Sequence, residues 1–428
     1  TTIEWYDFFL YGTAAALVFN KLFFPDADPL TGTLLAFATS ATGFVARPIG
    51  GVVFGHYGDK LGRKTVLVVT LLVMGIATFL IGLLPTYAAI GVAAPILLVV
   101  LRIVQGLGLG GEWGGAVLMS VEHAPPGRRG FFGSWPQMGV PAGLFLSTVV
   151  FLIVQEATSE EAFLSWGWRV PFLLSAILIA VGLFVRLRLY ESPAFQRVKD
   201  TGTEAPMPIM DVLRKYPREV LLAMGMRVAE NGTFYILTVY VLVYGNEELE
   251  LPKSTMLWGV VIAALLGLVT IPYYGALSDR VGRRPLYLGG ALFSLVFAFP
   301  FFLLVNTKTA LLIWLAIVLG VNVGHDLMYG PQAAYFAELF GTRVRYSGAS
   351  LGYQLASVFA GGFAPLIAAA LLKAWGWPAV AAYMALMAAI TVVATWLTSE
   401  TYQREIDADD QREQELASER RVTPEARA

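Results

Sequence analysis

Cysteine is absent from this 428-residue chain, and histidine occurs only three times. Without thiols the chain can form no disulfide, no thiolate nucleophile and no cysteine-ligated metal site. Three isolated histidines also argue against a structural metal, so we expect neither a metal nor any other cofactor. No G-x-x-x-x-G-K-[ST] phosphate-binding loop occurs, which disfavours ATP-driven transport. No D-D-x-x-D motif or paired-histidine signature occurs either, and we therefore expect a protein that is not an enzyme.

Charged residues are scarce as well. They make up 14% of the chain and apolar residues 57%, whereas a soluble domain is about a quarter charged. Long apolar runs such as 65–84 and 379–397 are sufficient, at roughly 20 residues each, to cross a bilayer as helices. The composition predicts an all-α polytopic protein that lies in a lipid bilayer and binds no nucleic acid. The twelve expected transmembrane helices lie near 1–24, 33–54, 65–84, 94–120, 132–154, 169–187, 219–244, 255–275, 286–305, 309–336, 347–371 and 378–398.

A ten-residue phrase occurs twice in the chain. Residues 55–64 and 275–284 both read G-x-x-x-D-[KR]-x-G-R-[KR], and both lie between long apolar runs. Glu122 precedes Arg129 by seven residues, and Glu338 precedes Arg345 by the same spacing. The matched pairs indicate a duplication into two parallel, pseudo-symmetric six-helix bundles that alternate access to a site between them. We predict bundles at 1–187 and 219–398, a cytoplasmic linker at 188–218 and a cytoplasmic tail at 399–428.

The orientation of the chain follows from its basic residues. Lysine and arginine gather on one set of loops, which includes both phrases and the 188–218 segment, whereas the opposite loops carry acids such as Glu160 and Glu247. Because basic loops stay on the cytoplasmic side, both termini are expected to be cytoplasmic. The chain starts with neither Met nor a basic leader, so we expect it to begin inside the first helix without a cleavable signal peptide.

With these residues in view, the chain resembles the major facilitator superfamily over essentially its whole length. The repeated phrase resembles that superfamily's signature loop. Stretches 4–8 (EWYDF), 110–115 (GGEWGG), 166–172 (WGWRVPF) and 345–350 (RYSGAS) resemble its metabolite:proton symporter branch, and 325–326 with 346–349 are most similar to shikimate permeases.

The resemblance implies a monomeric secondary transporter of the bacterial inner membrane, which imports a shikimate-like acid, a dicarboxylate or a zwitterion by proton symport. A betaine or proline-type osmolyte symporter is the alternative. A proton-independent facilitator or an exporter would use the same fold.

Ionisable residues inside the spans are candidates for function, because a charge within the bilayer is costly unless it is paired or lines a wet cavity. At about 100° per residue, Arg102, Gln105 and Glu112 share one face of span four, which we expect to point into a central cavity. Close packing of this helix is expected along a ridge of small residues. The ridge consists of Gly106, Gly110 and Gly114.

Arg102 and Arg47 are predicted to have different roles. The resemblance to proton-coupled sugar porters implies that Asp7 pairs with Arg102 and carries the proton, with Glu112 as the second choice. A static charge network is the alternative. Arg47 in span two could hold a substrate carboxylate through two parallel hydrogen bonds, or it could be the permanent partner of Glu4, Asp7 or Glu112.

In the second half, span ten places polar side chains on one side of a helix, where they could bind hydroxyl or amide groups, and His325 could titrate near neutral pH. A packed His325–Asp326 pair and mutual neutralisation of Arg227 and Glu230 are the alternatives. The predicted substrate-binding residues are Glu4, Tyr11, Arg47, Gln105, Gln137, Arg227, Glu230, Asn231, Asn322, His325, Asp326, Tyr329, Gln332, Tyr353 and Gln354.

The repeated phrases are predicted to form a cytoplasmic gate. Asp59 and Asp279 could each cap the N-terminus of a neighbouring helix, where the macrodipole favours negative charge, and the basic residues beside them could pair with Glu122 and Glu338. The resemblance implies that this arrangement latches the halves together on the inside, in addition to its topogenic role. The predicted gate consists of Gly55, Asp59, Lys60, Gly62, Arg63, Lys64, Glu122, Arg129, Asp279, Arg280, Gly282, Arg283, Arg284, Glu338 and Arg345.

Overall fold

The computed structural model describes residues 1–27, 29–61, 63–188, 208–340 and 345–403, which are helical almost throughout and contain no strand. The first half consists of α1 (Thr2–Ala14), η1 (Ala15–Phe19), α2 (Asn20–Phe23), α3 (Pro29–Leu61), α4 (Arg63–Leu83), α5 (Tyr87–Ile90), α6 (Ala93–Gly110), α7 (Trp113–Glu122), α8 (Arg129–Gln137), α9 (Gly139–Ala157), α10 (Glu160–Ala162), η2 (Phe163–Gly167), α11 (Arg169–Leu173) and α12 (Ser175–Leu187). Elements marked η are π-helical turns.

The short helix α14 (Pro208–Lys215) precedes the second half. That half consists of α15 (Pro217–Tyr235), η3 (Ile236–Tyr240), α16 (Val241–Val243), η4 (Tyr244–Glu248), α17 (Lys253–Val281), α18 (Arg283–Val305), α19 (Ala310–Val318), η5 (Leu319–His325), α20 (Asp326–Leu339), α21 (Arg345–Ala356), η6 (Ser357–Gly362), α22 (Ala364–Trp375) and α23 (Trp377–Leu397).

These elements join into twelve long helical segments, which correspond to the twelve predicted spans. Within the described part of the chain, nine of them are long and apolar enough to cross a membrane by length and composition. The other three are the segments 2–23, 29–61 and 217–248, which contain Asp7, Arg47 and Arg227 respectively. Buried charges also occur in apolar spans, such as Arg102 and Glu112 in 93–118 and Asp326 in 310–339.

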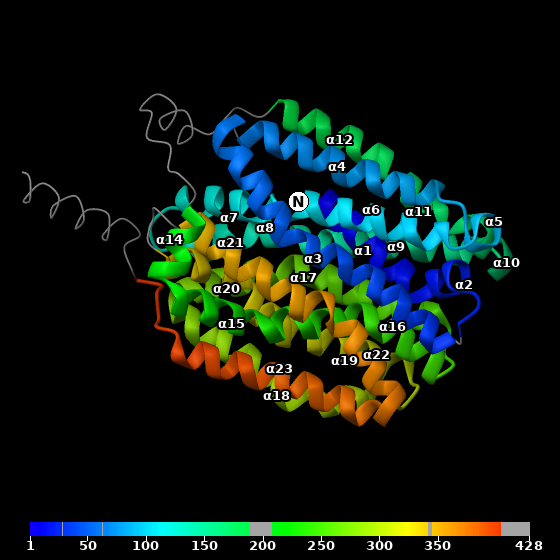
Figure 1. The fold of residues 1–428 in the computed structure, drawn as a ribbon. Helices are drawn as coiled ribbons and strands as arrows, with labels where there is room; N and C mark the ends of the chain where they lie inside the picture. Colours follow the sequence, from blue (N-terminus) through cyan, green and yellow to red (C-terminus); the bar gives the residue numbers. More distant parts are fainter. Residues whose placement is uncertain (28, 62, 189–207, 341–344, 404–428) are drawn as a thin grey trace, which may run out of the picture.

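The helices run side by side along one long axis, with α14 and α7 at one end and α5 and α10 at the other (Figure 1). Within the first half α3 packs on α6 and α1 on α9, and within the second half α15 and α18 pack on α23. The halves meet where α17 packs against α8 and α9, and where α3 packs against η6 and α22. The interface between them is thus lined by α3, α7, α8 and α9 of the first half and by α17, α20, α21, η6 and α22 of the second.

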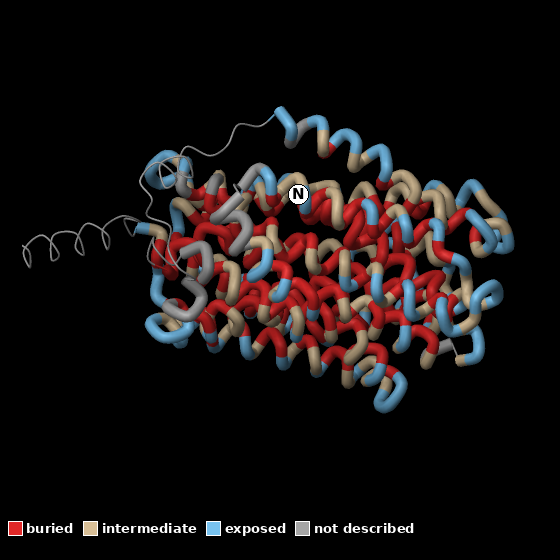
Figure 2. Tube along the Cα trace, turned by 45° about the horizontal axis from the view of Figure 1, so that its top comes forward, coloured by how far each residue is buried: buried red, intermediate tan, exposed pale blue. Residues whose placement is uncertain are grey.

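Burial follows this arrangement. Buried positions run through the interior along the whole length of the molecule, and exposed ones lie at the two ends and on the periphery (Figure 2). Large apolar side chains such as Val269, Val296 and Leu311 are mostly exposed on that periphery. An apolar perimeter around a polar interior is the arrangement expected of helices surrounded by lipid.

The predicted glycine ridge lets α6 approach α3 closely. A Cβ atom at Gly106 would lie 2.0 Å from the carbonyl oxygen of Gly43, and one at Gly110 would lie 2.0 Å from that of Arg47. At Gly43 a Cβ would lie 2.6 Å from the Nε atom of Arg102. These glycines therefore set both the helix spacing and the room that is left for the Arg102 side chain.

We expect Gly106→Ala to lower the melting temperature of the purified protein in detergent. The added methyl group meets backbone, which can move only with its helix, and overpacking of this kind costs about 1–3 kcal/mol. Gly115→Ala is the matched control, because a Cβ there meets nothing within 4 Å. Equal melting temperatures for the two variants would contradict the proposed role of the ridge.

Candidate functional site

Two arginines of the first half are buried at the centre of the molecule beside the same aromatic ring. The guanidinium carbon of Arg47 lies 4.0 Å from the centre of the Phe8 ring, and that of Arg102 lies 3.9 Å from it. The Arg47 guanidinium carbon also lies 4.3 Å from the centre of the Phe44 ring and 5.3 Å from that of the Trp5 ring. Among the described side chains, neither arginine forms an ion pair with a carboxylate.

Asp7 does not pair with Arg102, contrary to what the resemblance implies. Its Oδ1 accepts a hydrogen bond from the Ser175 hydroxyl at 2.6 Å, and its other oxygen is buried without a hydrogen-bond partner. Arg102 instead donates to Gln105 Oε1 at 3.0 Å and to the backbone oxygen of Ser40 at 3.3 Å.

The hydrogen bonds of Arg102 continue to a hydroxyl group of α4. Gln105 Nε2 donates to the Thr78 hydroxyl at 2.7 Å, and Thr78 donates its own hydrogen to the backbone oxygen of Met74 at 2.9 Å. Asp7 and Arg102 are thus each held by neutral partners, Asp7 by Ser175 and Arg102 by Gln105 and the Ser40 backbone.

The other predicted residues of the first half are also buried. Glu4 and Glu112 both approach the Thr1 nitrogen, at 2.9 and 3.2 Å. Tyr11 donates from its hydroxyl to Thr39 Oγ1 at 2.7 Å, and its ring lies 4.2 Å from the Arg102 guanidinium carbon. Arg102, Gln105 and Glu112 lie on the interior face of their helix, as their spacing predicts.

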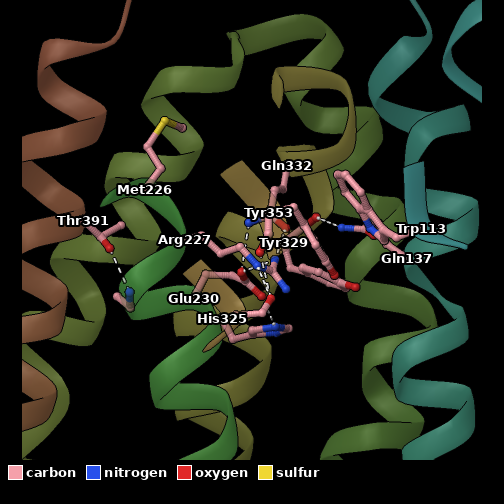
Figure 3. A network of polar contacts seen from close by, with 12 residues as sticks. Trp113, Gln137, Met226, Arg227, Glu230, His325, Tyr329, Gln332, Tyr353 and Thr391 are labelled. Carbon is pink, nitrogen blue, oxygen red and sulfur yellow. Dashed lines mark hydrogen bonds and ion pairs between the residues drawn. The ribbon is translucent and has the colours of Figure 1, made fainter. Parts of the chain in front are cut away.

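The second half contains a closed network of charges (Figure 3). Arg227 Nη1 lies 2.8 Å from Glu230 Oε2 and 2.9 Å from Gln332 Oε1. Gln332 Nε2 donates to the same Glu230 oxygen at 2.9 Å, and His325 Nε2 lies 3.2 Å from the other. Arg227 also donates to Ser357 at 3.2 Å. The predicted neutralisation of Arg227 by Glu230 is therefore present, within a wider network.

The polar face of span ten extends this network. His325 Nδ1 lies 2.7 Å from Asp326 Oδ1, and its ring stacks on Tyr329 with centroids 4.8 Å apart. Asp326 accepts hydrogen bonds from Asn322 Nδ2 at 2.9 Å and from Thr270. The π-helical turn η5 ends at His325, and such turns are frequent at functional sites. Asn231, also predicted, is buried with its side-chain oxygen unpaired.

Aromatic and amide side chains join the halves next to these charges. Tyr353 stacks on Trp113, with centroids 3.7 Å apart and ring planes 17° apart, and the Arg227 guanidinium carbon lies 3.2 Å from the Tyr353 ring centre. Trp113 donates to Gln137 Oε1 at 3.0 Å, and Gln354 donates to the backbone oxygen of Gly110 at 3.2 Å. These contacts bring Gln137 and Trp113 of the first half next to Tyr353 and the charged network of the second half (Figure 3).

The second copy of the repeated phrase bridges the halves at the α14 end. Asp279 accepts hydrogen bonds from the backbone N–H groups of Gly130 at 2.7 Å and Phe131 at 2.9 Å, which are the first turn of α8. Arg283 holds Asp279 at 2.7 Å and Glu338 at 3.1 Å. The helix cap and the pairing with Glu338 thus have the predicted geometry, while their role as a gate stays a prediction.

The remaining gate residues are less completely described. Gly282 has a φ of 103°, a conformation that only glycine adopts readily, and it separates α17 from α18. Arg280 is exposed, and Arg284 donates to the backbone oxygen of Trp396 at 2.5 Å. Arg129 begins α8. The side chains of the other predicted gate residues lie outside the described part of the chain. These residues are Gly55, Asp59, Lys60, Gly62, Arg63, Lys64, Glu122 and Arg345.

The halves also touch at the α5 end, through a residue that was not predicted. Glu247 Oε1 accepts hydrogen bonds from Thr33 at 2.9 Å and from Asn20 at 3.2 Å. Lys253 reaches the backbone oxygen of Leu17 at 3.5 Å, and Lys373 donates to Thr31 at 2.9 Å. Polar contacts therefore bridge the halves at both ends of the molecule, on either side of the charged centre.

We expect Asp279→Asn to loosen the α14 end. The substitution removes the charge that the α8 N-terminus and Arg283 both stabilise, and hydrogen bonds to charged groups contribute roughly 1.5–3 kcal/mol each. A single cysteine at the buried position Ser134 would report this opening, since the chain has no other thiol. Its labelling by an impermeant maleimide from the α14 side should become at least several-fold faster.

Asp26→Asn, an exposed acid at the opposite end, is the matched control and should leave that labelling rate unchanged. Unaltered labelling in Asp279→Asn would show that the contact does not hold the two halves together.

Sequence reasoning missed several residues of the centre. Ser175 and Thr78 are small hydroxyl residues inside apolar helices, and nothing in their own segments points to Asp7. Phe8, Phe44 and Tyr235 resemble ordinary core aromatics. The only available signal was proximity to the predicted charges, because Phe8 directly follows Asp7 and Phe44 lies three residues before Arg47. No group of metal-binding side chains occurs in the described part of the chain.

A bundle of long helices with an apolar perimeter, buried charges at its centre and polar contacts between its halves at both ends defines a polytopic membrane carrier. A family model described as "Major Facilitator Superfamily" matches residues 2–361 of this chain. The chain belongs to the major facilitator superfamily, and it is a transporter of metabolites.

Several relatives match almost the whole chain. The inner membrane metabolite transport protein YhjE of Escherichia coli strain K12 is 44% identical over 406 residues, which are 94% of this chain and 92% of the relative. The shikimate transporter of the same strain is 45% identical over 386 residues, 89% of this chain and 88% of the relative. The proline/betaine transporter of that strain is 35% identical, over 92% of this chain and 80% of its own length.

Among solved structures, a partially occluded inward-open conformation of the xylose transporter XylE of E. coli has the same fold. Its TM-score is 0.70 at 18% identity, and the match covers 94% of this chain and 98% of that one. The predicted fold class, twelve helices in two bundles, is confirmed by this likeness.

Proposed function

We propose that this chain imports a small organic acid of the shikimate or dicarboxylate type across the bacterial inner membrane, together with protons and by alternating access. One observation carries the proposal: Arg47 and Arg102 are buried at the centre without a carboxylate partner among the described side chains. An unpaired buried charge is costly, and an anionic substrate would compensate it. The names of the shikimate and metabolite transport relatives agree with such a substrate.

The remaining parts of the site have complementary tasks in this proposal. Arg47 binds the substrate carboxylate, and the second-half network around Glu230 and His325 faces the polar groups of the substrate. Asp7 takes up the proton on the carboxylate oxygen that has no hydrogen-bond partner, while Arg102 is held by Gln105. The α14 end is the cytoplasmic end, where Asp279 closes the path, and Glu247 closes it at the opposite end.

Proton symport of a zwitterion such as betaine is the second candidate function. A proline/betaine transporter is among the relatives, and the aromatic rings of Trp5, Phe8 and Phe44 around the centre are the kind of surface that binds quaternary ammonium groups. In this structure, however, these rings are already in contact with the guanidinium of Arg47. The anionic substrate is therefore the better supported of the two.

The experiment that separates these substrates is uptake of labelled shikimate, 2-oxoglutarate, citrate and betaine by a transport-deficient host that expresses the chain. We expect uptake of an organic acid, shikimate first, which collapses when the proton gradient is dissipated. Uptake of betaine alone would overturn the organic-acid proposal in favour of the osmolyte alternative. Uptake that is indifferent to the proton gradient would instead point to a facilitator.

A further inference from the structure

The two unpaired arginines line different pockets. Arg102 lines one together with Phe37, Ser40 and Val239, and Arg47 lines another together with Glu112 and residues of α7, α8 and α21. The two pockets have no residue in common. Each arginine has side-chain nitrogens that are buried without a hydrogen-bond partner, Nη2 in Arg102 and both Nε and Nη2 in Arg47.

The Phe8 ring is in contact with the arginines of both pockets. Both guanidinium carbons lie within 4.0 Å of its centre. The ring is held edge-on by Phe44, with centroids 4.9 Å apart, and it also contacts Tyr235. These three aromatic side chains, Phe8, Phe44 and Tyr235, form a septum between the Arg102 pocket and the Arg47 pocket.

Stacking on an aromatic ring does not fully compensate the two charges. A cation–π contact contributes about 2 kcal/mol when it is desolvated, whereas a buried ion without its partner costs several kcal/mol. Both arginines are in this situation, and each has donor nitrogens to spare. A planar guanidinium with free donors binds a carboxylate through two parallel hydrogen bonds. Each pocket therefore has the chemistry of an anion site.

The pockets lie in sequence along the transport axis. Helix α6 runs from near the α5 end towards α7, and on this helix Arg102 precedes Leu109, which lines the Arg47 pocket. The Arg102 pocket also contains Gly12 and Pro365, whereas the Arg47 pocket contains Ala116 and Pro136. The first is therefore nearer the α5 end and the second nearer the α14 end.

The lining of each pocket differs in character. The Arg102 pocket is mainly aromatic and aliphatic, so apart from its cation it suits the apolar part of a substrate. The Arg47 pocket adds Glu112, Tyr353 and Gln354, and the side-chain oxygen of Gln354 is buried without a partner. This second pocket can accept hydrogen bonds from substrate hydroxyl groups.

We propose that the substrate carboxylate binds at two successive sites, first at Arg102 and then at Arg47, and that the Phe8 septum separates them. The ligand class is a small hydroxylated carboxylic acid, and the inference rests on the proposed function as an organic-anion transporter. Arg102 thereby becomes a substrate-binding residue. Movement of the Phe8 ring passes the carboxylate from one guanidinium to the other.

Cysteine protection tests the two sites separately, because every introduced thiol is the only one in the chain. Ser40→Cys reports on the Arg102 pocket and Ala116→Cys on the Arg47 pocket. The probe is the acid with the highest uptake in the transport panel, and the reagent is a membrane-impermeant methanethiosulfonate applied to vesicles of both orientations. We expect saturating probe to slow labelling at least fivefold at both positions, and to leave labelling of the exposed control Thr307→Cys unchanged.

The arginine variants then assign each protection to its own site. Arg102→Gln should abolish protection at Ser40→Cys and preserve it at Ala116→Cys, and Arg47→Gln should do the opposite. Arg102→Lys keeps the charge and should retain part of the protection at Ser40→Cys. Partial protection in this variant would also show that the protein folds with a substitution at position 102.

Loss of both protections in either variant would overturn the inference in favour of one shared site, and so would intact protection of Ser40→Cys in Arg102→Gln. A wild-type chain that carries betaine but no acid overturns the proposed function itself, and with it this inference.

Discussion

Arg47→Gln is expected to raise the half-saturating substrate concentration for uptake by about 100-fold. The substitution removes two charge-assisted hydrogen bonds to the substrate carboxylate, which contribute roughly 1.5 kcal/mol or more each, and 1.4 kcal/mol corresponds to about a tenfold change in affinity. The glutamine is uncharged and shorter, so the cation–π contacts of the guanidinium with Phe8 and Phe44 are lost as well. Initial uptake rates over a range of substrate concentrations measure the effect.

Two companion variants make this result specific. Arg47→Lys keeps the charge but not the planar fork of donors, and it should show an intermediate loss. Arg218→Gln removes an exposed arginine of the same kind and should transport like the wild type. An Arg47→Gln protein that folds and transports with an unchanged half-saturation would exclude Arg47 as the carboxylate anchor.

Asp7→Asn is expected to abolish accumulation of substrate against its gradient while exchange of substrate across the membrane continues. The carboxylate is the group that takes up the proton in this account, and the amide that replaces it cannot be protonated. Asparagine still accepts the hydrogen bond from Ser175, so the local packing is preserved. Proteoliposomes with an imposed pH gradient measure accumulation, and counterflow of labelled substrate measures exchange.

Asp26→Asn is the matched control, an exposed acid that should leave both activities intact. An Asp7→Asn protein that still concentrates substrate would show that another group carries the proton. Glu112, the second choice from the sequence, would then be tested as Glu112→Gln in the same two assays.

The fold was largely predictable from the sequence because its determinants are local. Runs of apolar residues define the spans, the recurring phrase defines the duplication, and the i, i+3 spacing of Arg227 and Glu230 places them in contact. The pairing of Arg283 with Glu338 could also be anticipated, because the repeat places the same two residue types at matching positions in both halves. Helical periodicity likewise placed Arg102 and Glu112 on the buried face of one helix.

The partners of the first-half charges could not be predicted in this way. Ser175 is 168 residues away from Asp7 in the chain, and its contact depends on how α12 packs against α1. The Phe8 ring beside both arginines depends on the rotation of α1 relative to α3 and α6. Spacing within one helix says nothing about that rotation. The sequence therefore identified which residues carry charge at the centre, but not which of them are left without a counter-charge.

The organic anion is expected to enter the cell together with protons. The most direct measurement is the external pH of a weakly buffered suspension of de-energised cells that express the chain, followed when the transported acid is added. Symport predicts that the medium becomes more alkaline as the acid enters, and that Asp7→Asn cells show no such change. Uptake of the acid by wild-type cells without any alkalinisation would contradict proton coupling.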